Sequence, residues 1–192
     1  MKPCIFFDRD GTLIEERNYL SDPEQAVLIP GAAEAVRMAR AAGYLAVVLT
    51  NQSGVGRGYF SMQDVEAVHR RMEEMLAAEG ARLDGIYICP HAPEEDCGCR
   101  KPRTGLVERA ARELDIDLAR SWMIGDKEAD IELAANAGMK SVLVMTGYGE
   151  ASASGVSATL SARDVMSAVE KVLAFTAAAR EVRPEAPDAG TD

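Results

Sequence analysis

The hydrophobic positions of this chain fall into short apolar runs, separated for the most part by longer segments with helical periodicity. Five runs have the length and composition of buried β-strands: Cys4–Phe7, Leu45–Thr50, Ile86–Cys89, Trp122–Gly125 and Val142–Thr146. The helical segments are Gly31–Ala42, Met62–Glu79, Thr104–Leu114, Lys127–Ala137 and about Ala162–Ala179. Strands that alternate with helices predict an α/β domain, in which a parallel sheet carries helices on both faces.

Residues that begin and end helices stand at the boundaries of these segments. Pro30 precedes the first helical segment and Gly43 follows it, the usual order of proline before a helix and glycine after it. Ser61 is a candidate N-cap for the second segment, which ends at Gly80. His69 lies inside that segment without a partner motif nearby, so we interpret it as a surface or core histidine.

The length of 192 residues suits one domain with a sizeable core. We assign residues 1–175 to that domain. The remaining segment, 176–192, contains the sequence REVRPEAPDAGTD, which is rich in proline, alanine and acidic residues and has no apolar period. This composition predicts a disordered C-terminal tail.

The formal net charge of −10 argues against a broad nucleic-acid-binding surface, which needs clustered lysine and arginine. The apolar runs are shorter than a membrane span, and the N-terminus has no signal-peptide core. We therefore expect a cytoplasmic protein without nucleic-acid or membrane partners. Without an obvious exposed apolar stripe, we expect a monomer.

The first apolar run leads directly into two carboxylates, in the sequence IFFDRDGTL. Asp8 and Asp10 are two residues apart, so in an extended segment both side chains point the same way. Ligands of open parallel sheets bind at the carboxyl ends of the strands. Close carboxylates repel one another unless a cation lies between them or one is protonated. We interpret the pair as part of a Mg²⁺ site, because Mg²⁺ prefers oxygen ligands.

A polar, glycine-rich loop follows the second predicted strand, in the sequence LTNQSGVGRGYF. Its side chains offer hydroxyl and amide groups to a ligand at the same sheet edge, from Thr50, Asn51, Gln52 and Ser53. The glycine spacing fits neither the dinucleotide-binding fingerprint nor a Walker motif. Taken alone, the segment is equally well interpreted as an ordinary strand-to-helix loop.

Charged residues at two further places can complete this site. Asp126, in MIGDKEAD, follows the fourth predicted strand and is a good third Mg²⁺ ligand, although it could also cap the next helix. Asp130 lies one helical turn further and could reinforce it. Lys101, in CRKPRTG, is a candidate for neutralising a transferring phosphoryl group, although a surface cation would look the same.

A cluster of nitrogen and sulfur donors lies within the sequence CPHAPEEDCGC: Cys89, His91, Cys97 and Cys99. Four protein ligands at this spacing fit a closed, tetrahedral and therefore structural zinc site. The alternative is a set of free thiols in a mobile loop, since a disulfide across one residue would be strained. We predict that the zinc loop, residues 89–99, holds the following Arg100 and Lys101 rigidly.

Taken in order, DRDGT, TNQSG, RKP and IGDKEAD resemble the motifs of the haloacid dehalogenase (HAD) superfamily of phosphatases. The Cys-His-Cys-Cys loop before RKP is similar to that of the branch containing heptose bisphosphate phosphatases and histidinol phosphatases. The resemblance covers about residues 4 to 150. It implies a Rossmann-like, three-layer α/β fold without a large cap domain.

The resemblance also implies a role for each motif. Asp8 is the nucleophile that forms an aspartyl-phosphate, and Asp10 is the general acid and then the general base. Mg²⁺ is held by Asp8, the backbone carbonyl of Asp10, and Asp126. Thr50 and Lys101 hold the phosphoryl oxygens. Further contacts with the sugar phosphate substrate are implied for Gly11, Tyr19, Asn51, Gln52, Ser53, Arg100 and Lys127.

Two features within the branch favour a heptose substrate. Ser53 in TNQSG resembles the heptose enzymes, because histidinol phosphatases usually carry aspartate at that position. Tyr19 also lies where the heptose enzymes carry tyrosine. The short spacing between His91 and Cys97 resembles histidinol phosphatases instead. We expect hydrolysis of the 7-phosphate of D-glycero-D-manno-heptose 1,7-bisphosphate, in the supply of nucleotide-activated heptose for surface polysaccharide. The alternatives are a histidinol-phosphate phosphatase and, less well supported, a non-catalytic zinc-stabilised binding module.

Overall fold

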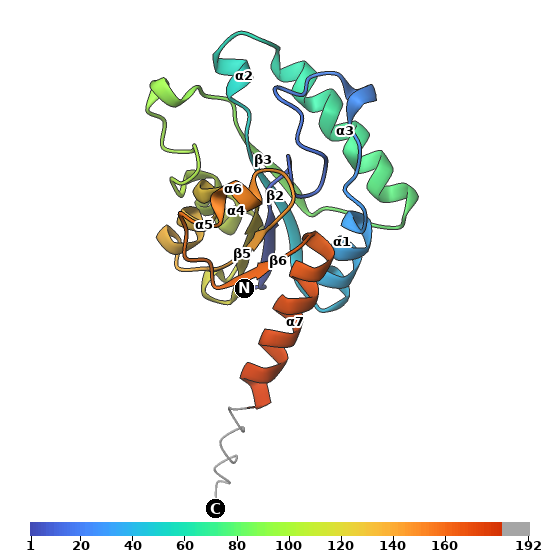
Figure 1. Ribbon diagram of the computed structural model, residues 1–192, viewed down its shortest axis with the longest axis vertical. Helices are drawn as coiled ribbons and strands as arrows, with labels where there is room; N and C mark the ends of the chain where they lie inside the picture. Colours follow the sequence, from blue (N-terminus) through green and yellow to red (C-terminus); the bar gives the residue numbers. More distant parts are fainter. Residues whose placement is uncertain (182–192) are drawn as a thin grey trace, which may run out of the picture.

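The computed structural model describes residues 1–181 and has one parallel sheet at its centre (Figure 1). The strands lie in the order β3-β2-β1-β4-β5-β6, and every neighbouring pair is parallel. Their bounds are β1 (Cys4–Phe7), β2 (Leu45–Asn51), β3 (Gly85–Cys89), β4 (Trp122–Gly125), β5 (Lys140–Val144) and β6 (Leu160–Ala162). The predicted α/β fold with a parallel sheet is confirmed.

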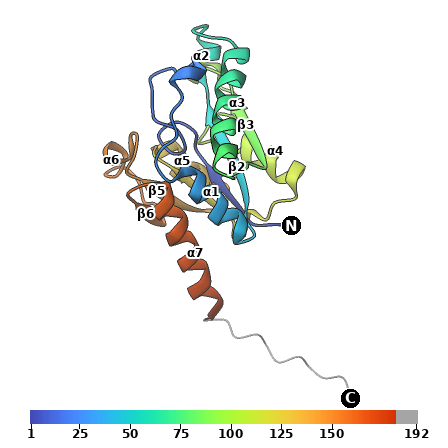
Figure 2. The same cartoon turned by 90° about the vertical axis from the view of Figure 1, so that its right-hand side faces the viewer.

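The helices of the described residues cover both faces of this sheet (Figures 1 and 2). They are α1 (Ala32–Ala41), α2 (Ser53–Gly56), α3 (Met62–Ala78), α4 (Gly105–Leu114), α5 (Glu128–Asn136), α6 (Gly149–Ser152) and α7 (Val165–Glu181). Three short 3₁₀ helices, at Pro23–Gln25, Pro93–Glu95 and Leu118–Arg120, lie in the connecting segments. Within residues 1–181 no second domain is inserted, in agreement with the absence of a large cap.

Alternating side chains of β1 divide the core into two layers, because successive residues of a strand point to opposite faces. Ile5 and Phe7 pack into the core that contains buried residues of α1, α3 and α7. Cys4 and Phe6 pack into the other core, against buried residues of α4 and α5. The three-layer arrangement expected from the sequence is therefore present, with the buried strand β1 at its centre.

Several boundaries differ from the predictions. β6 and the short helices α2 and α6 were not predicted, and Ala162, expected to begin the last helix, instead ends β6. α7 continues to Glu181, past the predicted domain boundary at residue 175, and the Thr176 hydroxyl lies 3.0 Å from the Tyr44 hydroxyl. The first residues of the predicted tail are thus helical; its remainder, 182–192, lies outside the described residues.

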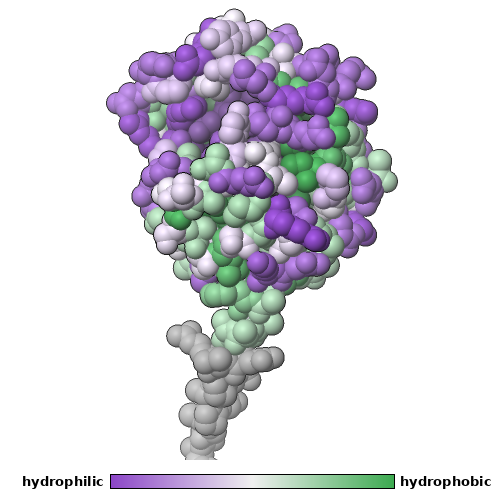
Figure 3. Space-filling view, viewed as in Figure 1, coloured by the Kyte–Doolittle hydropathy of each residue, from purple (hydrophilic) through white to green (hydrophobic). Residues whose placement is uncertain are grey.

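The surface seen from the side of Figure 1 is mixed. Hydrophilic side chains cover most of its upper half, and the projecting lower end of α7 is pale green, which marks weakly hydrophobic residues (Figure 3). Within residues 1–181, no helix combines the length and the apolar character needed to cross a membrane.

Candidate active site

The register of the sheet brings the ends of three strands together. Phe7 of β1 is paired with Val48 of β2 and with Ile124 of β4, and the Asp8 N–H donates to the Ile124 carbonyl at 2.9 Å. The polar segments that follow β1, β2 and β4 therefore meet at the carboxyl edge of the sheet, where parallel α/β proteins bind their ligands.

A tight turn after β1 presents Asp8 and Asp10 at this edge. The Arg9 carbonyl accepts the N–H groups of Leu13 and Ile14, both at 3.0 Å. Gly11 has φ +83°, a left-handed conformation that glycine adopts without strain. A Cβ atom at Gly11 would also collide with the carboxylate of Asp126. The glycine expected to contact substrate thus lies directly against a candidate metal ligand.

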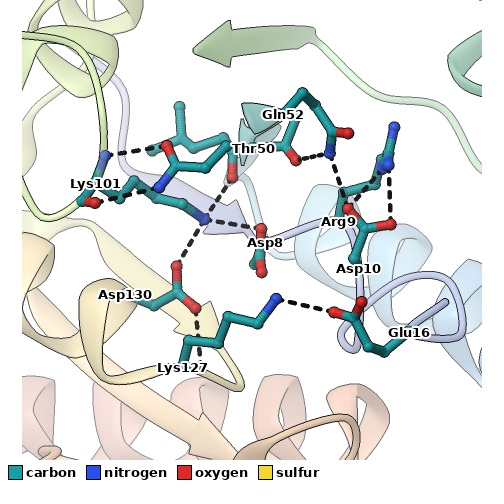
Figure 4. Close-up of polar contacts among 11 residues, drawn as sticks. Asp8, Arg9, Asp10, Glu16, Thr50, Gln52, Lys101, Lys127 and Asp130 are labelled. Atoms are coloured by element: carbon teal, nitrogen blue, oxygen red, sulfur yellow. Dashed lines mark hydrogen bonds and ion pairs between the residues drawn. The ribbon is translucent and has the colours of Figure 1, made fainter. Parts of the chain in front are cut away.

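The centre of the site is a buried cluster of charges (Figure 4). Lys101 Nζ lies 2.8 Å from Asp8 Oδ1 and 2.7 Å from Asp130 Oδ1, and it donates to the Leu49 carbonyl at 2.8 Å. Asp126 and Asp130 are fully buried. Burial alone would lower the pKa of Lys101, but the carboxylates of Asp130 and Asp8 outweigh burial and raise that pKa, so the lysine stays charged.

The three carboxylates respond differently to burial. Burial alone would raise the pKa of Asp8, but the neighbouring Lys101 and Lys127 outweigh it and hold that pKa below its ordinary value. Burial raises the pKa of Asp126 to about 8, with a further contribution from the Asp8 carboxylate. Burial also raises the pKa of Asp130 to about 6, against the opposing charge of Lys101. Asp8 is therefore the carboxylate of the cluster that most favours the ionised form, which is the form that the predicted nucleophile needs.

The environment of Asp126 fits a divalent cation. One oxygen of each of Asp8, Asp126 and Asp130 lies within 4.8 Å of the others. The Tyr148 N–H donates to Asp126 Oδ2 at 2.8 Å, whereas buried Oδ1 has no hydrogen-bond partner among residues 1–181. A hard cation such as Mg²⁺ would satisfy that oxygen and offset the raised pKa. Asp130 was expected only to reinforce the Mg²⁺ site, and its ion pair with Lys101 agrees with that supporting role.

Residues 50–56, at the end of β2 and just after it (the β2 loop), hold Asp10 and Lys101 in place. Gln52 Nε2 donates to Asp10 Oδ2 at 2.9 Å and to Thr50 Oγ1 at 2.8 Å. The Asn51 side chain holds the backbone of Lys101 on both sides, accepting its N–H at 3.1 Å and donating to its carbonyl at 3.2 Å. The predicted residues Thr50, Asn51 and Gln52 are thus brought to the site, with Gln52 and Thr50 almost fully buried.

A polar cavity of about 180 Å³ opens beside Asp10, large enough for part of a sugar phosphate. Tyr19, Ser53 and Lys127, all predicted to contact substrate, line it. Lys127 Nζ lies 2.8 Å from Glu16 Oε2 and 4.8 Å from the centroid of the Tyr148 ring. Tyr19 has φ +58° and packs edge-to-face on Tyr59 at 4.8 Å between ring centroids.

Arg100 lies beside the site, in a groove next to Lys101. Its guanidinium Nη1 donates to the His91 carbonyl at 3.4 Å, and the residue lines a neighbouring groove of about 210 Å³ beside Cys97, Lys101 and Pro102. It does not line the cavity that contains Tyr19 and Ser53. Arg100 thus contacts residues 89–99, referred to below as the cysteine loop, and lies outside the cavity beside Asp10.

The four predicted zinc ligands come together as a set. All four donor atoms lie within 4.8 Å of one another. The Sγ atoms of Cys89 and Cys99 each lie 3.5 Å from Cys97 Sγ, and His91 Nδ1 lies 3.7 Å and 3.3 Å from the first two. A tetrahedron with Zn–S bonds of about 2.3 Å has edges near these lengths. The cysteines are free in the structure, and the donor set fits zinc.

Sequence reasoning missed several residues of the site. Arg9, between the two aspartates, is almost fully buried and bonds to Asp10, and Gly147 approaches Asp126 as closely as Gly11 does. Glu16 and Tyr148 line the cavity with Lys127. The available signal for Arg9 was its position between two aspartates directly after an apolar run. Gly147 follows β5 in a loop that carried no recognisable motif.

Comparisons with known proteins agree with this geometry. A HAD-hydrolase-like family model matches residues 98–168. The chain is 44% identical over 160 residues to D-glycero-D-manno-heptose-1,7-bisphosphate 7-phosphatase of Thermosynechococcus vestitus, covering 78% of this chain and 82% of that protein. It is 45% identical over 154 residues to D-glycero-beta-D-manno-heptose-1,7-bisphosphate 7-phosphatase of Pasteurella multocida, covering 77% and 84%.

A solved structure shows the same fold. The D,D-heptose 1,7-bisphosphate phosphatase from B. bronchiseptica, complexed with magnesium and phosphate, matches with a TM-score of 0.85 and 34% sequence identity. The match covers 90% of this chain and 99% of that chain. Motifs, buried charges, fold and relatives therefore agree, and the chain belongs to the heptose-1,7-bisphosphate 7-phosphatase family of HAD-like hydrolases.

Proposed function

We propose that this protein is a Mg²⁺-dependent phosphatase that removes the 7-phosphate of D-glycero-D-manno-heptose 1,7-bisphosphate. The observation that carries the proposal is the Asp8 carboxylate, buried at the end of β1 and kept ionised beside Lys101. The names of relatives more than 40% identical to the chain favour heptose bisphosphate over histidinol phosphate.

In the first chemical step, a carboxylate oxygen of Asp8 attacks the phosphorus atom of the substrate. The bond between phosphorus and the sugar oxygen breaks, and protonated Asp10 donates its proton to the departing oxygen. Lys101 Nζ, 2.8 Å from Asp8 Oδ1, offsets the negative charge of the phosphoryl oxygens. Thr50 is assigned to the same oxygens, with its hydroxyl held by Gln52 at 2.8 Å.

In the second step, water hydrolyses the aspartyl-phosphate. Asp10, now a carboxylate, takes a proton from the water as its oxygen attacks phosphorus. The bond between phosphorus and Asp8 breaks, and phosphate leaves while Asp8 returns to its ionised form. One pair of aspartates thus serves both halves of the reaction, with Asp10 alternating between acid and base.

We assign Mg²⁺ to Asp8, the backbone carbonyl of Asp10, and Asp126, whose unpartnered Oδ1 supports this assignment. When bound, Mg²⁺ would offset the charge of the carboxylates and of the substrate phosphoryl group. We assign structural zinc to the Cys89, His91, Cys97 and Cys99 cluster. The zinc loop, residues 89–99, would then hold Lys101 in place at the carboxyl edge of the sheet.

We assign the heptose and its second phosphate to the polar cavity beside Asp10. Tyr19, Ser53 and Lys127 line it and offer a ring face, a hydroxyl and a cation. Asn51 and Gln52 line the side next to the phosphoryl group. Arg100 would reach substrate only from the adjacent groove. We further propose that the protein acts as a cytoplasmic monomer and supplies nucleotide-activated heptose synthesis.

Phosphate release in the presence of Mg²⁺ tests this function. We expect rapid release from heptose 1,7-bisphosphate, measured with both anomers at carbon 1, and slow release from histidinol phosphate. The faster anomer would identify the pathway that the product enters. Preference for histidinol phosphate would change the substrate but leave the mechanism standing.

The Asp8→Asn variant is the matched control, because it keeps the shape of the side chain and removes the nucleophile. It should lose turnover while its circular dichroism spectrum stays that of the wild type. Substantial residual activity of this variant would refute the assignment of Asp8. Absence of turnover with every phosphate ester in the wild-type protein with Mg²⁺ would favour a binding module instead.

A further inference from the structure

Arg9 is the largest fully buried side chain among the described residues, with 1% of its surface exposed. A buried guanidinium needs hydrogen-bond acceptors for its N–H groups, since leaving them unpaired costs stability. Two of its nitrogens bond to Asp10 in a fork, with Nε at 3.1 Å from Oδ2 and Nη2 at 2.9 Å from Oδ1 (Figure 4). Such a two-point contact fixes the plane of a carboxylate as well as its position.

The remaining nitrogen of Arg9 contacts His69 in α3, with 3.1 Å between Nη1 and Nε2. A guanidinium can only donate, so His69 Nε2 is the acceptor and the ring is neutral, with its proton on Nδ1. His69 is 5% exposed and lies on the buried face of α3 with Val65 and Met72. Burial and the charge of Arg9 lower the pKa of His69 to about 3, in keeping with a neutral acceptor.

From this chain of contacts we propose that His69 and Arg9 are positioning residues, which hold the general acid and base Asp10 in its reactive orientation. The inference rests on the proposed phosphatase function. Within residues 1–181, His69 makes no hydrogen bond to Asp10 and does not line the cavity beside Asp10, so its effect on Asp10 would pass through Arg9. A neutral acceptor at this place orients the guanidinium without cancelling its charge, whereas a carboxylate would draw Arg9 away from Asp10.

The hydrogen bonds also distinguish the two oxygens of Asp10. Oδ2 accepts from Arg9 Nε and from Gln52 Nε2, whereas among the described residues Oδ1 accepts only from Arg9 Nη2. The free lone pair of Oδ1 is therefore the available place for the proton that Asp10 gives to the sugar oxygen and later takes from water. Loss of the Arg9 contact would release both oxygens and misplace this proton.

The test compares two leaving groups in His69→Leu, which removes the acceptor of Arg9. A sugar oxygen must be protonated as it leaves, whereas p-nitrophenolate leaves without a proton. We expect kcat for heptose 1,7-bisphosphate to fall about tenfold, part of the usual contribution of general acid–base catalysis, with KM within about twofold. The first-turnover burst of p-nitrophenolate from p-nitrophenyl phosphate should keep the wild-type rate.

Two further variants separate positioning from folding. His69→Gln offers an amide oxygen near the place of Nε2 and should restore kcat to within about threefold of the wild type. Arg70→Leu, at an exposed neighbouring position of α3 that lines the groove outside His69, should leave both substrates unaffected. If His69→Leu does not fold, Arg9→Lys replaces it, because lysine keeps the charge and loses the fork.

Equal losses with both substrates, or no loss with either, would overturn the positioning role. In both cases an active wild-type protein would leave the proposed phosphatase function intact. A wild-type protein inactive towards both esters would overturn the function and this inference together. The positioning role is supported only if His69→Leu loses activity with the sugar substrate alone and His69→Gln keeps that activity.

Discussion

Two glycines surround the Asp126 carboxylate and fix where it can lie. A Cβ atom added to Gly11 or Gly147 would collide with Asp126 Oδ2, and both residues have positive φ, +83° and +56°. The carboxylate therefore occupies space that any other residue at these positions would fill. Because this packing fixes Oδ2, it also keeps Oδ1, which is buried and has no hydrogen-bond partner within residues 1–181, directed at the candidate metal position.

The substitution Gly147→Ala tests this packing. We expect it to raise the Mg²⁺ concentration for half-maximal phosphate release about tenfold, the usual effect of disturbing the support of a metal ligand. Gly43→Ala is the matched control, because Gly43 also has positive φ, at +86°, but its added Cβ would meet no atom within 4 Å. Both variants bear a left-handed strain of about 1 kcal/mol. Equal Mg²⁺ requirements in the two would contradict the packing argument.

His69 makes the stability of the fold depend on pH in a predictable direction. Its pKa is about 3 in the folded protein, because of burial and the charge of Arg9, against an ordinary value of 6.5 in the unfolded chain. Between these values only the unfolded state binds the proton. The contribution of His69 to the free energy of unfolding is therefore fully present above pH 6.5. It falls as the pH decreases from 6.5 towards 3, by about 1.4 kcal/mol per pH unit.

The measurement is urea unfolding of the wild type and of His69→Gln at pH 7 and pH 5. The wild type should lose about 2 kcal/mol more than the variant on this change, since glutamine does not titrate. Other groups that titrate, including Glu66 and Glu73 in the groove beside His69, are present in both proteins and cancel in the comparison. Identical pH dependence of the two proteins would mean that the pKa of His69 is the same in the folded and the unfolded state, and would contradict this prediction.

The site residues that could be predicted from the sequence are those with a local signal. Asp8, Asp10 and Asp126 directly follow apolar strands, and the cysteine cluster lies in one short segment. Arg9 and His69 are 60 residues apart, and each alone has an ordinary explanation. Their connection arises only when α3 packs over the end of β1. Position 69 did lie on the apolar face of a helical pattern, where a buried histidine needs a partner.

At the scale of elements, the cysteine loop supports two parts of the site. Its first residues accept backbone hydrogen bonds from the β2 loop, with Gln52 N at 2.7 Å from the Cys89 carbonyl and Gly56 N at 2.9 Å from the Pro90 carbonyl. Its end leads into Lys101, which Asn51 holds through the backbone. A change in this loop should therefore displace the phosphoryl-binding groups before it affects the sheet.

If the cluster holds zinc as we propose, its removal should reduce activity without unfolding the protein. We expect Cys97→Ala to lower bound zinc, measured by elemental analysis, and to lower kcat at least about tenfold while the far-ultraviolet circular dichroism is kept. Cys4→Ala is the control, because Cys4 is a buried cysteine of β1 outside the cluster. Full activity in zinc-free protein would separate the loop from phosphate handling.

Elements with a long apolar or amphipathic pattern could be predicted, and short ones could not. The five predicted strands each coincide with an observed strand, because their apolar residues are buried in the sheet. β6, the sixth, has three residues, of which only Ala162 is buried, so its place depends on pairing with β5. α2 has the sequence SGVG, whose glycines give no helical signal.

At the scale of the whole molecule, the last helix continues past the predicted domain boundary at residue 175. The helical pattern extended to about Ala179, whereas the polar, proline-rich composition that predicts a tail begins at REVRPEAPDAGTD. In the structure, Phe175 packs edge-to-face on Trp122 at 5.3 Å between ring centroids, and Thr176 reaches Tyr44. These contacts join the last helix to β4 and to the start of β2, so they belong to the folded unit.

Truncation locates the end of the folded unit. A chain that ends at Ala174 loses both contacts, and we expect its free energy of unfolding in urea to fall by about 2 kcal/mol. A chain that ends at Glu181 keeps them and should match the full chain, because the remaining residues are too polar to bury much apolar surface. Far-ultraviolet circular dichroism is the suitable signal, since removing Phe175 would itself change the fluorescence of Trp122. Equal stability of the two truncated chains would place the end of the folded unit at or before residue 174, and would mean that the contacts of Phe175 and Thr176 contribute nothing measurable to stability.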